Sequence, residues 1–162
     1  MKLDTSMYIP YQSELDNRIF STHNTTRALT QRDRLLAFCV ELSEFVNETR
    51  CFKYWSLKPA SEHFILLEEF ADGMHFLNSL CIDLNMEPVF EVTETETSLT
   101  ELTLQVIQAS SQCIDELTQT SLFTLYEKYL TLGKACGFTS DMLFESYLKK
   151  HQKNHVRQDE HY

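Results

Sequence analysis

The sequence predicts an all-α fold, a helical bundle of about five to six helices, and three observations lead to this fold class. The 162-residue chain has only three glycines and three prolines, fewer than the turns of β-sandwiches, barrels or Rossmann folds need. Apolar residues recur every three or four positions over most of the chain, as they do on one face of a helix. A hydrophobic share of 43% in a chain of this length indicates a single domain, residues 1–162, with its own core.

The first half of the chain contains three predicted helices. The first spans Tyr11 to His23, with Pro10 before it as a first-turn residue. The second spans about Leu29 to Arg50 and has a clear apolar stripe. The third spans Ser61 to about Leu84. Because this helix is apolar on nearly every side between Phe64 and Leu80, we expect it to be the central, most buried helix.

The second half begins with a polar segment, the predicted variable loop at about residues 85–98. Ser98 and Glu101 have the spacing of a capping box, which predicts the start of a fourth helix. Gly137 suits the C-terminal cap of a fifth helix. The last eight residues are polar and are expected to form a tail. The limits predicted for the helices of this half are Ser98–Leu117, Ser121–Ala135 and Ser140–Asn154.

The composition excludes several classes of partner. With 14 Lys and Arg against 24 Asp and Glu, the net charge is −10, which argues against a nucleic-acid partner because phosphate contacts need clustered cations. No apolar run approaches the roughly 18 residues of a membrane helix, and Met1 to Gln12 is too polar for a signal peptide. The five cysteines lack CxxC spacing, so we expect free thiols. A soluble, cytoplasmic protein that binds no membrane is therefore expected.

Two pairs of acidic residues lie on the second and third predicted helices: Glu41 with Glu44, and Glu69 with Asp72. Each pair is spaced i, i+3, so both carboxylates project from one face of their helix. If the two helices pack antiparallel, four carboxylates converge, and their desolvation and repulsion need a divalent cation. Hard oxygen ligands suit Mg²⁺ or Mn²⁺, which predicts a metal site in a four-helix core. Solvated surface charge is the alternative, and the apolar residues that share the face of Glu69 argue against it.

Three further features allow two interpretations each. His75 lies three residues past Asp72 and belongs either to the same site or to the core. Trp55, the single tryptophan, is either a loop aromatic packed on the core or a stacking platform for a nucleobase. The basic run near the C-terminus is either a solvated face or an arm that neutralises a polyphosphate. This run contains Lys149, Lys150, Lys153 and Arg157.

These residues together resemble a known family. The order Glu41-x-x-Glu44 followed by Glu69-x-x-Asp72 is similar to the signature of the all-α NTP pyrophosphohydrolases, the MazG-like superfamily. Three runs narrow the resemblance to the dimeric dUTPase family within it, over residues 12–162 and most strongly over 41–76. The runs are Phe52-Lys-Tyr-Trp55, Asp72-Gly-Met-His75-Phe76 and Lys149-Lys-His-Gln-Lys-Asn-His-Val-Arg157-Gln158.

The resemblance implies an Mg²⁺-dependent, homodimeric enzyme that hydrolyses dUTP to dUMP and pyrophosphate and so keeps uracil out of DNA. Whether dUDP is also a substrate stays open. Glu41, Glu44, Glu69 and Asp72 match the family's metal ligands, and Glu41 or Glu44 also matches the residue that positions the attacking water. The C-terminal segment at about 147–162 matches the family's phosphate-binding tail. The positions that match substrate-binding residues are Gln12, Trp55, His75, Phe76, Lys150, Asn154, Arg157 and Tyr162.

Three alternatives remain at the level of the sequence. A pyrophosphohydrolase that acts on another nucleoside triphosphate fits the same acidic residues. The resemblance includes phage members that engage repressor proteins, so binding of a protein partner such as a repressor is an added or replacing role. A di-iron bundle is the third alternative, although Asp72-x-x-His75 is its one partial match to the paired Glu-x-x-His motif of those proteins.

Overall fold

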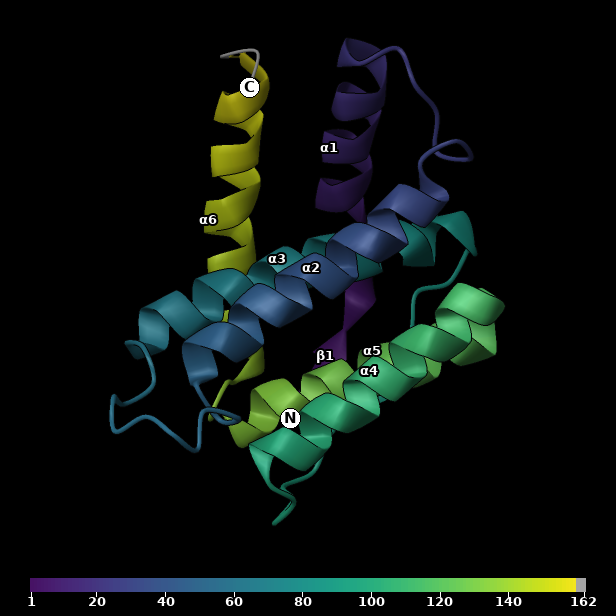
Figure 1. Ribbon diagram of the computed structural model, residues 1–162. Coiled ribbons are helices and arrows are strands. Elements are labelled where there is room, and N and C mark those ends of the chain that lie inside the picture. The colour runs from purple at the N-terminus through teal and green to yellow at the C-terminus, as the bar shows by residue number, and fades with distance from the viewer. Residues whose placement is uncertain (160–162) are drawn as a thin grey trace.

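The computed structural model describes residues 1–159 and confirms the all-α fold class (Figure 1). Within these residues the chain forms six α-helices, one 3-10 turn at Thr5–Met7 and one two-stranded sheet. The first five helices begin and end within two residues of their predicted limits. Their bounds are α1 Ile9–Thr22, α2 Gln31–Thr49, α3 His63–Asp83, α4 Leu99–Asp115, α5 Gln119–Ala135 and α6 Ser140–Asp159, and the strands are β1 Lys2–Asp4 and β2 Val89–Glu91.

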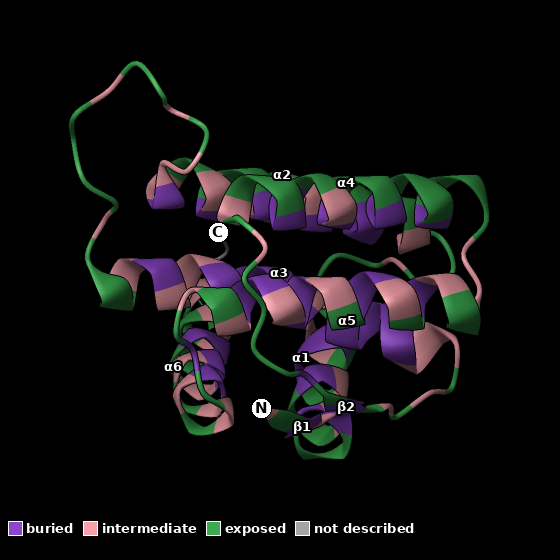
Figure 2. Ribbon diagram, turned by 90° about the horizontal axis from the view of Figure 1, so that it is seen from below, coloured by how far each residue is buried: buried purple, intermediate pink, exposed green. Residues whose placement is uncertain are grey.

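The helices are arranged in layers. Figure 2 shows α2 and α4 in one layer and α3 and α5 in the next, and these four helices form the core bundle. In this bundle α2 packs on α3, and α4 packs on α5. The remaining helices, α1 and α6, pack against α3 and against each other. The helices α1 and α6 therefore lie on the α2–α3 pair, on the side away from α4 and α5 (Figure 1).

The central position predicted for α3 is confirmed, because most of its residues from Leu66 to Cys81 are buried. Its Phe70 ring stacks on Tyr129 of α5 with the ring centroids 4.0 Å apart. This close approach depends on Gly73, since a Cβ atom there would lie 2.4 Å from the Tyr129 hydroxyl oxygen. The same hydroxyl donates a hydrogen bond to the Phe70 carbonyl at 2.9 Å. The α3–α5 interface is thus fixed by shape and by one buried hydrogen bond.

Two predicted caps are present. Ser98 accepts a hydrogen bond from the backbone N–H of Glu101 at the start of α4. Gly137 follows α5 with φ at +86°, a left-handed conformation that glycine adopts without steric cost.

The predicted end of α6 at Asn154 is wrong, because the helix continues to Asp159. The residues after Asn154 are polar and give no apolar periodicity, so the sequence alone predicts a tail. In the structure, α1 supplies their partners: Arg18 donates to the Nδ1 atom of His155 at 3.0 Å and pairs with the carboxylate of Asp159. Polar contacts with a neighbouring helix therefore extend α6. Tyr162, a predicted substrate-binding residue, lies outside the described residues.

The two-stranded sheet was not predicted. β1 and β2 pair antiparallel, with Leu3 opposite Phe90. Both of these side chains are buried. Each strand has three residues, too few for an alternating pattern to be read from the sequence. The rest of the segment at 85–98 lacks regular structure, as predicted for a loop.

The cysteines are free thiols, as expected. None of the helices in residues 1–159 combines the length and apolar character that a membrane crossing requires.

Candidate functional site

One cavity of about 610 Å³ opens between α1, α2, α3 and α6. Side chains from all four helices line it, so it lies where the two outer helices meet the core bundle. Ten of the twelve site residues predicted from the sequence line this cavity. They are Gln12, Glu41, Glu44, Glu69, Asp72, His75, Phe76, Lys150, Asn154 and Arg157.

The acidic pairs meet in this cavity as expected from their helical spacing. Glu41 from α2 and Glu69 and Asp72 from α3 each offer one carboxylate oxygen, and these oxygens all lie within 4.8 Å of one another. We call these three residues the acid cluster. Glu44 lines the same cavity outside this closest group. Packing of α2 on α3 therefore places negative charge from two helices at one point.

The environment of the acid cluster disfavours its charged form. Burial, with added repulsion from Asp72 and Glu44, raises the pKa of Glu41 from 4.5 to about 7. Burial also raises the pKa of Glu69, and the charge of Asp72 adds to this. The pKa of Asp72 is raised by burial and held back by Lys150. Three carboxyl groups with raised pKa values in one cavity mark a candidate functional site, since such charge needs a compensating partner.

Part of that compensation comes from α6. The Nζ atom of Lys150 lies 2.5 Å from Asp72 and 3.3 Å from Glu68. Lys153, one turn along the helix, pairs with Glu68 at 2.8 Å. Within the basic run, Lys150 thus lies against the acid cluster, whereas Lys149 and Lys153 stay exposed. The acidic side chains that line the cavity still outnumber the basic ones, which leaves net negative charge there.

The donor set of the acid cluster fits a hard divalent cation. All its candidate ligand atoms are carboxylate oxygens, which Mg²⁺ and Mn²⁺ prefer and which soft metals do not. A divalent ion also supplies the positive charge that the raised pKa values show to be lacking. The residues present therefore fit the Mg²⁺ site predicted from the sequence.

Another part of the cavity lining is a fixed polar corner. Gln12 of α1 donates from Nε2 to a carboxylate oxygen of Asp16 at 2.7 Å, which orients its amide. Its Oε1 atom accepts from the hydroxyl of Tyr147 at 2.6 Å and from Nδ1 of His75 at 2.9 Å. The Nδ1 atom of His75 therefore carries a proton and its Nε2 atom is an acceptor. That Nε2 atom is buried and has no hydrogen-bond partner in the described part of the chain.

The imidazole of His75 is held as a neutral ring. Burial, aided by the nearby His151, lowers its pKa to about 3. The ring stacks on Tyr147 with the centroids 3.9 Å apart. A neutral, immobile ring with one unpaired acceptor on a cavity wall can accept a hydrogen bond from a ligand.

Sequence reasoning missed the residues that hold this corner. Asp16 is buried and also accepts hydrogen bonds from Ser79 at 2.5 Å and Arg27 at 2.9 Å. Arg34 forms a second buried pair with Asp83, at 2.7 Å. The one signal in the sequence is that Asp16 follows Gln12 by four residues and so shares its helix face. The arginine partners come from other segments of the chain and have no local signal.

Trp55 does not line the cavity of this chain. It lies in the connection between α2 and α3, where it is 65% exposed and packs edge to face against Tyr54 and Phe52. The structure of one chain thus separates Trp55 from the other predicted substrate-binding residues that it describes.

A family model described as dUTPase matches residues 5–162. No curated protein sequence matches the chain. The match covers every α-helix, and therefore the acid cluster, the basic residues of α6 and the corner around Gln12.

Proposed function

Because the chain belongs to the all-α, dimeric dUTPase family, we propose that it hydrolyses dUTP to dUMP and pyrophosphate with Mg²⁺. One observation carries the proposal beyond family membership. A single cavity joins a carboxylate cluster, a basic helix face and a polar corner with an unpaired buried acceptor. These three parts correspond in chemistry to a cation, a triphosphate and a nucleobase.

At the first part, Glu41, Glu69 and Asp72 would hold the cation, with Glu44 beside them. Mg²⁺, or Mn²⁺ in its place, shields phosphate charge and lowers the pKa of bound water when it occupies such a site. A carboxylate of Glu41 or Glu44 then accepts the proton of the attacking water. The water oxygen bonds to phosphorus, the bridging P–O bond between the α- and β-phosphates breaks, and pyrophosphate leaves.

At the second part, Lys150, Asn154 and Arg157 bind the phosphate oxygens. They follow one another at spacings of four and three residues, so they lie on one face of α6. Lys150 is paired with Asp72 in the structure described here. A cation held by the acid cluster would compensate the charge of Asp72, and the ammonium group of Lys150 would then be able to bind a phosphate. Arg157 can bind two phosphate oxygens through its planar guanidinium group.

At the third part, His75 and Gln12 select the base. The Nε2 atom of His75 accepts the N3–H of uracil and so gains the partner it lacks. Cytosine has an acceptor at N3, which would leave two buried lone pairs opposed, and such mismatches discriminate strongly. The second N–H of Gln12 donates to a uracil carbonyl, because Asp16 fixes the amide. Phe76 supplies an apolar wall.

The test is pyrophosphate release from dUTP, dTTP, dCTP and UTP, and phosphate release from dUDP, each with Mg²⁺. It is run for the wild-type chain, Glu69→Gln and the control Glu127→Gln on the exposed face of α5. Turnover of dUTP that Glu69→Gln abolishes and Glu127→Gln leaves unchanged is the expected result. Equal turnover of the other triphosphates would replace dUTPase by a pyrophosphohydrolase of broader specificity. No turnover by a folded chain would overturn the proposal. Release of phosphate from dUDP would show whether the diphosphate is also a substrate.

We propose further that the active form is a homodimer. The outer faces of α2 and α4 lie in one layer of the bundle (Figure 2) and expose Leu36, Val40, Leu104 and Ile107. Burial of such side chains against a second copy removes apolar surface from water. Light scattering after gel filtration should give twice the mass of the 162-residue chain for wild type and the monomer mass for Leu36→Glu with Ile107→Glu.

The proposed contact of Trp55 with the base depends on a second copy or on movement of the connection after α2, since Trp55 lies outside the cavity lining of its own chain. Trp55→Ala should raise the KM for dUTP, and the matched exposed variant Tyr54→Ala should change it less. An unchanged KM in Trp55→Ala would remove Trp55 from the substrate site.

A further inference from the structure

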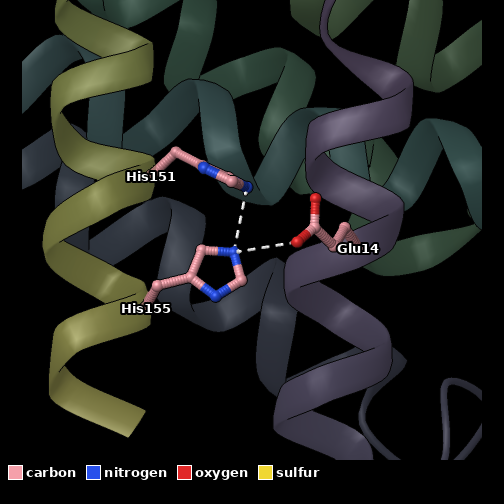
Figure 3. Close-up of side chains that lie close together, drawn as sticks. All are labelled: Glu14, His151 and His155. Atoms are coloured by element: carbon pink, nitrogen blue, oxygen red, sulfur yellow. Dashed lines mark hydrogen bonds and ion pairs between the residues drawn. The ribbon is translucent and has the colours of Figure 1, made fainter. Parts of the chain in front are cut away.

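We propose a second metal site, between α1 and α6, in which Glu14, His151 and His155 bind a divalent transition-metal ion of the Zn²⁺ class (Figure 3). We call these residues the histidine site. It is separate from the acid cluster, and its role is structural: the ion would tie the N-terminal helix of the cavity to the C-terminal one. The proposal does not depend on which nucleotide the cavity accepts.

The ring nitrogens are spaced as a bound metal ion requires. His151 and His155 lie four residues apart on α6, so their rings share one face. Their Nε2 atoms are 3.2 Å apart. An ion at the usual distance of about 2.0–2.1 Å from both atoms would form an N–metal–N angle of about 100°, close to tetrahedral. Two histidines one turn apart are a common element of zinc sites on helices.

Glu14 of α1 provides the third ligand. Its Oε1 atom is 3.9 Å from Nε2 of His155, and the three candidate ligand atoms lie within 4.8 Å of one another. The Glu14 side chain is 69% exposed, so a small change of rotamer brings the carboxylate to coordination distance. Figure 3 shows the carboxylate directed toward the two rings from the opposite helix. Two imidazoles and one carboxylate, with water in the fourth position, form a ligand set known for zinc.

Without an ion, the hydrogen bonds of this cluster conflict. Nε2 of His151 lies 3.0 Å from the backbone carbonyl of Tyr11, a contact that requires a proton on Nε2. Nδ1 of His155 lies 3.0 Å from a guanidinium nitrogen of Arg18, so a neutral His155 carries its proton on Nε2. Two N–H groups then face each other at 3.2 Å. A metal ion removes this conflict, because it binds the lone pairs of both Nε2 atoms and displaces both protons. The hydrogen bond from His151 to the Tyr11 carbonyl is lost in that exchange.

The assignment requires a change of hydrogen-bond partner at His155. When Nε2 of His155 binds an ion, its Nδ1 atom carries a proton and needs an acceptor. Asp159 lies one turn along α6 and already pairs with Arg18 beside this ring. We assign to Asp159 the acceptor role in the ion-bound form, with Arg18 released from Nδ1. A carboxylate behind a ligating histidine is the usual outer-shell arrangement.

The position of the site determines what an ion would do there. His151 adjoins Lys150, His155 adjoins Asn154, and Glu14 is two residues from Gln12. An ion held by these neighbours would fix the spacing of the two helices that carry the base-binding and phosphate-binding residues of the cavity. Imidazole ligands select Zn²⁺, Co²⁺ or Ni²⁺ over Mg²⁺. The two sites therefore take different metals.

The test uses Co²⁺ as the probe, added to the full chain after chelator treatment and with excess Mg²⁺ to occupy the acid cluster. Four-coordinate Co²⁺ with nitrogen ligands has strong visible absorption, whereas Co²⁺ in octahedral oxygen sites absorbs weakly. We expect one strongly absorbing Co²⁺ per chain, and an affinity at least about tenfold lower in His155→Gln and in Glu14→Gln. The matched control His63→Gln, an exposed histidine at the start of α3, should bind as wild type does.

Two more variants separate this proposal from the proposed function. Glu69→Gln should keep the strong Co²⁺ absorption, because it changes only the acid cluster. Arg18→Gln should tighten Co²⁺ binding, since the amide oxygen of the introduced glutamine can accept the Nδ1 proton of His155. The proposal is overturned if wild type shows no strong absorption, if His155→Gln binds like wild type, or if Glu69→Gln abolishes the signal. A chain that hydrolyses dUTP but lacks the absorption would contradict the histidine site alone.

Discussion

Replacement of Glu41 by glutamine should stabilise the metal-free protein above neutral pH. A carboxyl group whose pKa is raised on folding binds its proton more tightly in the folded state, so its ionisation lowers stability. The pKa of Glu41 rises from 4.5 to about 7. The destabilisation is absent below about pH 4.5, grows as the pH rises toward 7, and is complete above that. A glutamine side chain has nearly the same size as glutamate and carries no ionisable group, so Glu41→Gln removes this pH dependence.

The magnitude follows from the same two values. At about 1.36 kcal/mol for each pH unit between two pKa values, the cost of ionising Glu41 is at most about 3 kcal/mol. Solvent that reaches the cavity and movement of Lys150 screen the repulsion, which reduces the expected gain for Glu41→Gln to about 1–2 kcal/mol at pH 8. At pH 5 the gain should be close to zero.

Urea denaturation with EDTA, followed by circular dichroism at pH 5 and at pH 8, measures this gain. Glu127→Gln on the exposed face of α5 is the matched control and should change the free energy of unfolding by less than about 0.5 kcal/mol at both pH values. Millimolar Mg²⁺ should stabilise wild type more than Glu41→Gln, because an ion that binds only the folded state adds to its stability. An equal gain at both pH values, or none at pH 8, would refute the assignment of uncompensated charge to Glu41.

Three other substitutions test the remaining parts of the structure by urea denaturation. Arg34→Met breaks the buried pair with Asp83 and should cost about 3–5 kcal/mol, and the exposed Arg32→Met should cost less than about 1 kcal/mol; equal costs would contradict the role of the buried pair. Gly73→Ala forces a Cβ atom toward the hydroxyl of Tyr129 and should cost about 1–3 kcal/mol, so a neutral effect would mean that the α3–α5 interface is looser than described. Lys150→Met leaves the carboxylate of Asp72 without its cation and should cost about 2–3 kcal/mol without metal, a loss that Mg²⁺ should largely restore; a loss that Mg²⁺ does not restore would contradict the shared position of Lys150 and the metal.

The sequence predicts what repeats along a helix and misses what depends on contacts between distant segments. The acid cluster was predictable because Glu41, Glu69 and Asp72 lie on helices whose apolar stripes determine which face is buried. The contact of Gln12 with Tyr147 was not, because Tyr147 is 135 residues away in the chain.

The end of α6 is another feature that depends on contacts between distant segments of the chain. A run of polar residues carries no apolar period, so the sequence predicted a tail after Asn154. The helix persists because Arg18 of α1 bonds both His155 and Asp159. Polar contacts between helices have no local pattern, and the position of Glu14 beside His151 and His155 depends on the same packing. The features that sequence reasoning missed are therefore concentrated where α1 meets α6.

The charge of the acid cluster lowers the stability of the folded, metal-free protein, and the packing of the bundle does not require these carboxylates. Apolar residues of similar volume at Glu41, Glu69 and Asp72 would be more stable there than carboxylates with raised pKa values. Lys150 relieves only part of this cost. A cation that binds the folded state compensates the remaining repulsion between the carboxylates. This contributes to its binding free energy only when the carboxylates are ionised. The instability of the empty cluster and its affinity for a divalent ion are thus two measurements of the same repulsion, so a variant that gains stability without metal should lose metal affinity to a similar extent.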